Sequence, residues 1–238
     1  MEHFLLIGAI IIIAYFCESI FGFGGGLISI PLISLLMPVR TSIILILLFQ
    51  LLMGVLVIKT AKYTAWKTVG ILIAGLLLGT LIGTYSLVIF SDSLLRKILA
   101  MSIFLFLVKM IFFQKFTLSP KKKFIGFLAG FFGGYFQGVI GTGGPVLMMY
   151  LLSAVPDKTQ LRATLIFLFF VTSIVRLLFV VGTSLVTPEL LRIALPLAPL
   201  FIGVVFLGQH FHWKVSDRYY RWGVYVILLF SSTSLFLK

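Results

Sequence analysis

The chain has 238 residues, of which 61% are hydrophobic and 11% are charged, and its mean hydropathy is +1.22. A soluble domain of this length cannot bury so much apolar surface, so the composition indicates an integral, multi-pass membrane protein. The formal net charge of +13 does not indicate a nucleic-acid partner, because the basic residues lie in short stretches between apolar runs. The single cysteine, Cys17, excludes an internal disulfide.

The first apolar run covers 4–21 and leads into a cluster of glycines. It is not predicted to be a signal peptide, because no basic region precedes it and no convincing cleavage site follows it. The next run, 27–37, would reach about 16 Å as a helix and is too short to cross a bilayer. We therefore predict a broken or re-entrant helix hairpin over 4–37. Three transmembrane helices are expected to follow, at roughly 42–58, 68–90 and 94–113.

The second half of the chain repeats this plan after a basic stretch at 115–123. An apolar run at 124–140, a second glycine cluster and a short run at 146–155 predict a second hairpin. Pro196 and Pro199 should kink one of the later helices. Three more spans are expected, at roughly 160–181, from Pro188 onward and at 222–237.

A shift of 119 residues, half of the 238-residue length, relates the two halves. It places three glycines of the first cluster on three of the second, and it places Glu18 on Gln137, its close isostere. The glycine pairs are Gly22 and Gly141, Gly24 and Gly143, and Gly25 and Gly144. Each half holds one hairpin and three crossings, an odd number, so the two halves should enter the membrane from opposite sides.

The expected fold is therefore an all-α polytopic membrane protein built from two inverted-topology repeats. Each repeat has a broken or re-entrant helix hairpin plus three transmembrane helices. A single transmembrane domain covers 1–238, with repeat 1 at about 1–114, a linking cytoplasmic loop at about 115–123 and repeat 2 at about 124–238.

Two of the expected spans carry glycine at every fourth position, the spacing that lets membrane helices approach closely. We interpret these glycines as packing residues. They are Gly75, Gly79 and Gly83 in one span, and Gly126, Gly130, Gly134 and Gly138 in the other.

The basic residues predict the orientation. Twelve lysines and arginines fall in the stretches 59–67, 115–123, 158–162 and 214–221, and five fall on the opposite side. By the positive-inside rule the first side is cytoplasmic. Both termini are then expected outside, in a multi-pass protein of the plasma (cell inner) membrane.

Each hairpin is interrupted by a glycine-rich motif close to the expected mid-bilayer depth. Broken backbone survives inside a membrane only where protein buries it or where it lines a wet cavity. Two breaks in corresponding places indicate the substrate site of a transporter, and close helix packing by the glycines is the alternative interpretation. The candidate binding residues are Gly22, Phe23, Gly24, Gly25, Gly26, Gly141, Thr142, Gly143, Gly144 and Pro145.

A helix that restarts after each break would direct free N–H groups and its positive dipole end toward a bound anion. The expected restarts are at 25–28 and 144–147, and neither motif contains lysine or arginine. Thr142 offers a hydroxyl donor, and Phe23 offers an apolar wall or a gate. The motifs therefore favour a small anion held by backbone N–H groups.

Three polar residues within the spans are candidates for coupling or for lining the site. Glu18 lies one turn before Gly22, and an ionisable group at that depth is a functional candidate. Burial and a nearby anion favour its protonated form, so Glu18 either couples anion movement to a proton or stays neutral and hydrogen-bonds, as Gln137 would. Arg176 either snorkels to the outer end of its span or lines an anion route.

Enzyme activity is not expected. The first glycine cluster is not a dinucleotide fingerprint, because no βαβ unit surrounds it. His210 and His212 lie in a loop expected from His210 to Arg221, with no further ligand nearby, so no metal site is predicted. No cofactor is expected either.

The segment from Phe21 to Gly26, followed by Pro31, and the segment from Gly138 to Pro145 resemble the paired motifs of the sulfite exporter TauE/SafE family. This family is also called the toluene sulfonate uptake permease family. The resemblance covers nearly the whole chain in length, span plan and motif layout. Glu18 departs from the family pattern, where a glutamine or a small residue is more usual.

The resemblance implies a secondary transporter, a permease or exporter, of small sulfur-containing anions such as sulfite, sulfonates or sulfoacetate. Its partners would be the anionic substrate and the lipid bilayer, while proton coupling and a homodimer are left open. The alternatives are a transporter of another small anion, an ion channel and a non-transporting membrane assembly factor. The duplicated break argues against the last of these, because a scaffold would not need it.

Overall fold

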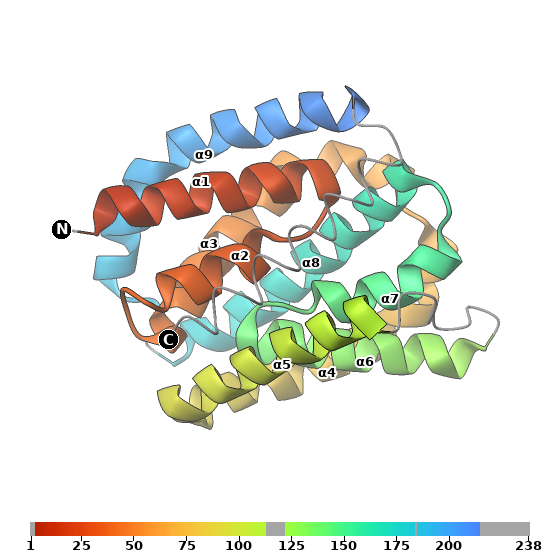
Figure 1. The fold of residues 1–238 in the computed structure, drawn as a ribbon, viewed down its shortest axis with the longest axis horizontal. Helices are drawn as coiled ribbons and strands as arrows, with labels where there is room; N and C mark the ends of the chain where they lie inside the picture. The colour runs from red at the N-terminus through yellow and green to blue at the C-terminus, as the bar shows by residue number, and fades with distance from the viewer. Residues whose placement is uncertain (1–2, 113–121, 184, 215–238) are drawn as a thin grey trace. The chain divides into compact units, whose positions relative to one another are not determined.

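The computed structural model describes residues 3–112, 122–183 and 185–214, and the described part is helical throughout (Figure 1). The first helices are α1 (Phe4–Phe21), α2 (Gly25–Ile33), α3 (Val39–Leu56), the short 3-10 helix η1 (Ile58–Tyr63), α4 (Trp66–Ile89) and α5 (Asp92–Phe112). The second group is α6 (Lys123–Ile140), α7 (Gly144–Ala154), α8 (Lys158–Val181) and α9 (Pro188–Lys214).

Six of the described helices are long and apolar enough to cross a membrane: α1, α3, α4, α6, α8 and α9. The helix α2 has 9 residues and α7 has 11, so both are too short to span. The expectation of an all-α, multi-pass membrane protein with a short helix after each break is confirmed for the described residues.

The helix boundaries repeat along the chain with the offset predicted from the glycines. The helices α6, α7 and α8 begin 119 residues after α1, α2 and α3, with starts at 4 and 123, 25 and 144, and 39 and 158. Local structure therefore follows the internal repeat. The inverted relation of the two halves stays a prediction.

One predicted loop is wrong. His210 and His212 belong to α9, which continues to Lys214. The His212 side chain is fully buried, and its Nδ1 lies 2.8 Å from the carbonyl oxygen of Ile20 at the end of α1. Contact with another helix keeps this segment helical where its polar composition alone suggested a loop. The span expected at 222–237 lies outside the described residues.

The helices group into two compact units, and each unit takes helices from both halves of the sequence. Unit 1 consists of Met1–Phe49, Ser91–Gln114 and Leu185–Lys238, and unit 2 consists of Gln50–Phe90 and Lys115–Ser184. The first hairpin thus shares a unit with α9, and the second hairpin shares a unit with α4.

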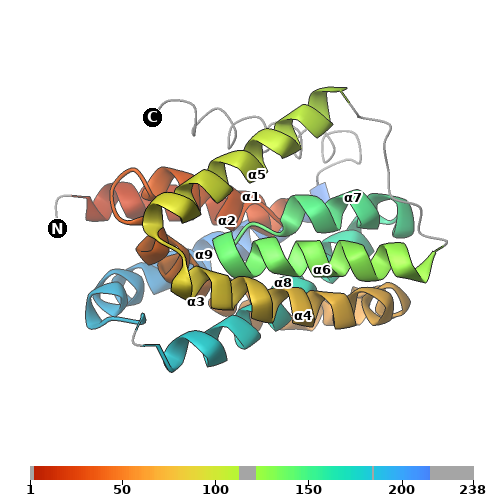
Figure 2. The same cartoon turned by 90° about the horizontal axis from the view of Figure 1, so that it is seen from below.

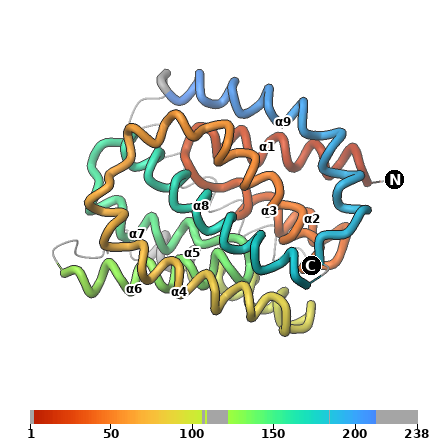
Figure 3. The backbone as a smooth tube through the Cα atoms, turned by 180° about the vertical axis from the view of Figure 1, so that it is seen from behind, coloured from red at the N-terminus to blue at the C-terminus, as the bar shows by residue number. Residues whose placement is uncertain are grey.

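In unit 1 the helices α1 and α9 lie side by side and run in the same direction (Figures 1 and 3). Gly8 faces Leu197, and eleven residues further along each helix Ser19 faces Gly208. Tyr15 fills the space beside them, because its ring lies 4.8 Å from the Phe201 ring and its hydroxyl donates to the Ile46 carbonyl at 3.1 Å. This packing fixes the C-terminal end of α1, where the first break begins.

In unit 2 the helices α4 and α6 are in backbone contact (Figure 2). A Cβ atom on Gly75, Gly79 or Gly83 would overlap the carbonyl oxygens of Phe127, Phe131 and Tyr135, respectively. Glycines of α6 approach α4 in the same way at Gly130, Gly134 and Gly138. The predicted packing role of these glycines is confirmed, and their register shows that α4 and α6 run parallel. Both helices therefore begin at the same end of unit 2.

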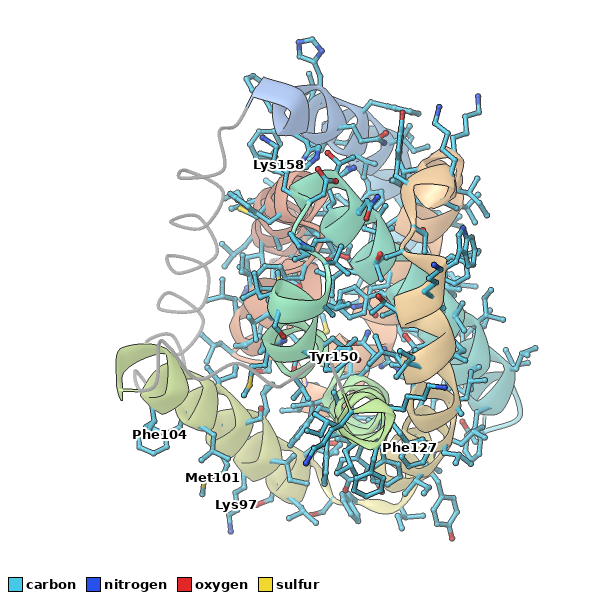
Figure 4. All side chains as sticks on the ribbon, turned by 90° about the vertical axis from the view of Figure 1, so that its right-hand side faces the viewer. Lys97, Met101, Phe104, Phe127, Tyr150 and Lys158 are labelled. Carbon is cyan, nitrogen blue, oxygen red and sulfur yellow. The ribbon has the colours of Figure 1, made fainter. Side chains whose placement is uncertain are left out.

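Gly126 has a different neighbour from the other glycines of α6. A Cβ atom there would meet the Ile71 side chain and the hydroxyl of Tyr150, which extends from α7 (Figure 4). The missing side chain thus leaves room for a buried tyrosine, and α7 packs against α6 just after the second break.

Candidate anion site at the helix breaks

The first break is built from two glycines in left-handed conformations. Gly22 ends α1 with φ 83° and ψ 1°, and Gly24 precedes α2 with φ 117° and ψ −23°. The N–H of Gly22 donates to the carbonyl oxygen of Glu18 at 2.7 Å. An L-residue with a side chain is strained at these φ values, so glycine is required here for the chain to turn between the helices.

The second break resembles the first on one side only. Gly141 ends α6 with φ 70° and ψ 16°, as Gly22 ends α1. Gly143, however, is right-handed, with φ −73° and ψ −9°. Pro145 lies in the first turn of α7, where its missing N–H costs no helical bond.

A side-chain oxygen from the preceding helix binds the backbone at each restart. The Gly25 N–H donates to the Glu18 carboxyl group, and the Gly143 N–H donates to Gln137 Oε1 at 2.8 Å. Both acceptor side chains are buried. Glu18 and Gln137 therefore perform the same local task, which is to satisfy an N–H group that the break leaves without a helical partner.

Few N–H groups remain for a ligand at each restart. Beyond Gly25, α2 has the N–H groups of Gly26 and Leu27 before its regular hydrogen bonds begin with Ile28. In α7 the corresponding groups belong to Gly144 and Val146, because Pro145 has none and the Leu147 N–H bonds to Gly143. Each restart thus has fewer N–H groups available to an anion than the expected ranges, 25–28 and 144–147, contain.

In unit 2 a polar network extends from the second break to Arg176, and its central residue is Gln50 of α3. Gln50 Oε1 accepts hydrogen bonds from Gln137 Nε2 at 3.1 Å and from Arg176 Nη1 at 3.2 Å. Gln50 Nε2 donates to the Gly141 carbonyl at 3.5 Å. Arg176 is fully buried, so it does not snorkel to an outer surface.

Two buried hydroxyl groups of unit 2 accompany this network. Thr142 Oγ1 lies in the break itself, and Ser173 Oγ lies one helical turn before Arg176 on α8. Neither atom has a hydrogen-bond partner among the described residues. Because buried hydroxyl groups are almost always hydrogen-bonded, these two are candidates to bind a ligand.

The sequence matches the family described as "Sulfite exporter TauE/SafE" over residues 6–235. The chain belongs to the sulfite exporter TauE/SafE family. Comparisons with curated proteins and with solved structures gave no match. Family membership and the six apolar helices make this a multi-pass membrane protein of a transporter family, and the family implies transport of sulfite or related sulfur-containing anions.

The sequence patterns predict most residues of this network as site residues, but they do not predict Gln50 and Ser173. A signal for Gln50 was available, because it is the one amide in the apolar run from Ile43 to Leu56. Serine is too common in membrane helices to stand out, so Ser173 carried no comparable signal.

The described residues around the first break include buried polar side chains of their own, among them Glu18 and Ser19. Phe23 is buried between Gly22 and Gly24, in unit 1. His212 also lies near this break through its contact with Ile20. Among the described residues no group of three or more His, Cys, Asp or Glu is placed to hold a metal ion.

Proposed function

We propose that the protein is a secondary transporter whose substrate is a small sulfur-containing anion, such as sulfite, a sulfonate or sulfoacetate, bound at the glycine breaks. The observation that carries this proposal is the link from Arg176 through Gln50 to the backbone of the second break. Family membership supports the substrate class.

The buried guanidinium of Arg176 supplies the charge for anion binding. Burying a charged side chain within a transmembrane segment costs free energy, so such a residue is a functional candidate by default. A guanidinium also presents its donors in a planar fork that matches the oxygens of an oxyanion. Because Gln50 Oε1 accepts from both Arg176 and Gln137, one nitrogen of the guanidinium is linked to the residues of the break.

Neutral donors complete the proposed site. The hydroxyl groups of Thr142 and Ser173 would donate to oxygens of the anion, and so would the N–H groups of Gly144 and Val146. The first break, taken by itself, offers donors of the same kind at the N–H groups of Gly26 and Leu27, with Phe23 as an apolar wall. A site with one cation and several neutral donors can release its anion, which a transporter must do.

The decisive experiment uses the purified protein in liposomes. Uptake of sulfite, thiosulfate, sulfoacetate, taurine and sulfate, and of chloride as an anion without sulfur, is measured with and without a proton gradient. We expect saturable transport of at least one of the sulfur-containing anions. Transport of an unrelated small anion instead would favour the first alternative, a conductance without saturation would favour a channel, and no flux would favour an assembly factor.

The variant Gln50→Glu tests the site within that experiment. A carboxylate at this position would lie against Arg176 and take the place of the anion, so we expect a folded protein whose transport falls by at least about tenfold. Gln160→Glu is the matched control, because Gln160 is exposed on α8 and the charge change is the same. Equal transport by the two variants would remove Gln50 from the site.

Glu18 has a capping role in this proposal. Its carboxyl group accepts the Gly25 N–H, and the neutral amide of Gln137 does the same at the other break. A neutral side chain is therefore sufficient for the local structure. Proton coupling through Glu18 is the alternative, and it predicts that Glu18→Gln still exchanges the anion but no longer accumulates it under a proton gradient.

A further inference from the structure

A groove lies at the surface of unit 2, between the first turns of α4 and α6. Its volume is about 670 Å³. It is distinct from the breaks, because both helices are at their first residues here. The lining residues are Lys67, Gly70, Ile71, Lys123, Phe124 and Phe127.

The rim of the groove is basic. Lys67 is the second residue of α4 and Lys123 is the first residue of α6, and both are exposed. Because α4 and α6 run parallel, the positive ends of two helix dipoles lie at the same rim. The one acidic residue in the sequence of unit 2, Asp157, caps α8 by accepting the Gln160 N–H at 2.7 Å.

The interior of the groove is apolar. Gly70 and Ile71 lie about one turn along α4 from Lys67, and Phe127 lies one turn along α6 from Lys123. One turn places these three residues about 5–6 Å further along the helices than the two lysines. Phe127 extends beside α4 in Figure 4. A Cβ atom on Gly70 would meet no atom of the described residues within 4 Å, so these residues leave the space there open.

We propose that this groove binds an anionic phospholipid, with its phosphate between Lys67 and Lys123 and an acyl chain along Ile71 and Phe127. Both helices are candidate membrane spans, so their first residues lie near head-group level. Basic residues at that level attract anionic lipids, and an exposed tryptophan such as Trp66 suits the interface. The charged rim of the groove would lie at the level of the lipid phosphate, and its apolar interior would lie at the level of the acyl chains.

The test measures lipid binding to the delipidated full chain by native mass spectrometry and by the shift in unfolding temperature. Phosphatidylglycerol is compared with phosphatidylcholine of the same acyl chains. We expect phosphatidylglycerol to bind with at least about tenfold higher affinity. Equal binding of the two lipids would overturn the proposal.

Variants locate the site. Lys67→Gln with Lys123→Gln should abolish the preference, and Gly70→Leu should weaken binding by filling the groove while keeping both charges. Lys59→Gln with Lys62→Gln is the matched control, because both lysines are exposed in unit 2 but lie outside the groove, and it should keep the preference. Equal loss in the control would show general surface attraction instead of a site.

A soluble phosphate serves as the last probe. Glycerol phosphate carries the charged group without acyl chains, and we expect it not to displace phosphatidylglycerol at millimolar concentration. Displacement would assign the groove to a soluble phosphate compound and would overturn its assignment to lipid.

Discussion

At the scale of single residues, the two breaks use a carboxyl group and an amide for the same task. Glu18 and Gln137 each accept an N–H group of the restarting segment. We expect Glu18→Gln to fold and to accumulate substrate under a proton gradient as the unchanged protein does, because an amide oxygen can accept the Gly25 N–H. Glu18→Leu should lower stability by about 1–3 kcal/mol, since it leaves that N–H buried without an acceptor.

Gradient-driven accumulation in liposomes and thermal unfolding check this expectation. If Glu18→Gln still exchanges anion but no longer accumulates it against its gradient, Glu18 couples transport to a proton and the capping account is incomplete.

The hydroxyl groups give a second prediction at this scale. Thr142→Val and Ser173→Ala remove one hydroxyl each with little change in shape, so expression should persist. A hydrogen bond to a charged ligand contributes about 1.5–3 kcal/mol, and we expect each variant to raise KM for the anion at least about tenfold. Thr84→Val is the control, because its Oγ1 donates within its own helix, to Thr80 O at 2.7 Å. An unchanged KM in both site variants would contradict the assignment.

At the scale of helices, the parallel contact of α4 and α6 depends on the absence of side chains along one stripe. Gly79→Leu would force a side chain into the Phe131 carbonyl. The backbone cannot move aside as the end of a flexible side chain can. We therefore expect Gly79→Leu to lower the free energy of unfolding by about 1–3 kcal/mol or more and to give a poor membrane yield. Gly203→Leu on α9 should be tolerated, because no atom of the described part of the chain lies within 4 Å of its Cβ position.

Detergent-solubilised yield and thermal unfolding compare the two variants. Similar behaviour of Gly79→Leu and Gly203→Leu would show that the glycine stripe does not hold the helices together.

Gly143 is partly a packing glycine like Gly79, since a Cβ there would overlap the Gly133 carbonyl. Its substitution therefore reports packing as well as binding, whereas Gly24 is constrained by its φ of 117°.

At the scale of the whole molecule, the prediction concerns orientation. In a Cys17→Ser background, we expect a cysteine placed at position 2 or 238 to react with an impermeant thiol reagent added outside. A cysteine at position 121 should react only after the membrane is permeabilised. The expectation rests on the positive-inside rule, and these three positions lie outside the described residues. Labelling of position 121 in intact cells would reverse the orientation.

Composition and local pattern by themselves determined the class of the protein, the positions of both breaks and the packing stripes. These features depend on hydropathy and on the missing side chain of glycine, which are local properties. Even the 119-residue offset between the glycine clusters predicts the starts of α6 and α7. The family motifs lie in the same local segments, which is why the resemblance and the family match agree.

Tertiary structure alone decided which residues meet at the second break. Gln50 is 91 residues from Gly141 and 126 residues from Arg176 along the chain, and no local pattern encodes such contacts. The grouping of α4 with α6 and of α9 with α1 is equally non-local, because it depends on side-chain shapes that fit across helices. The same holds for His212, which stays helical and buried because the end of α1 offers it the Ile20 carbonyl.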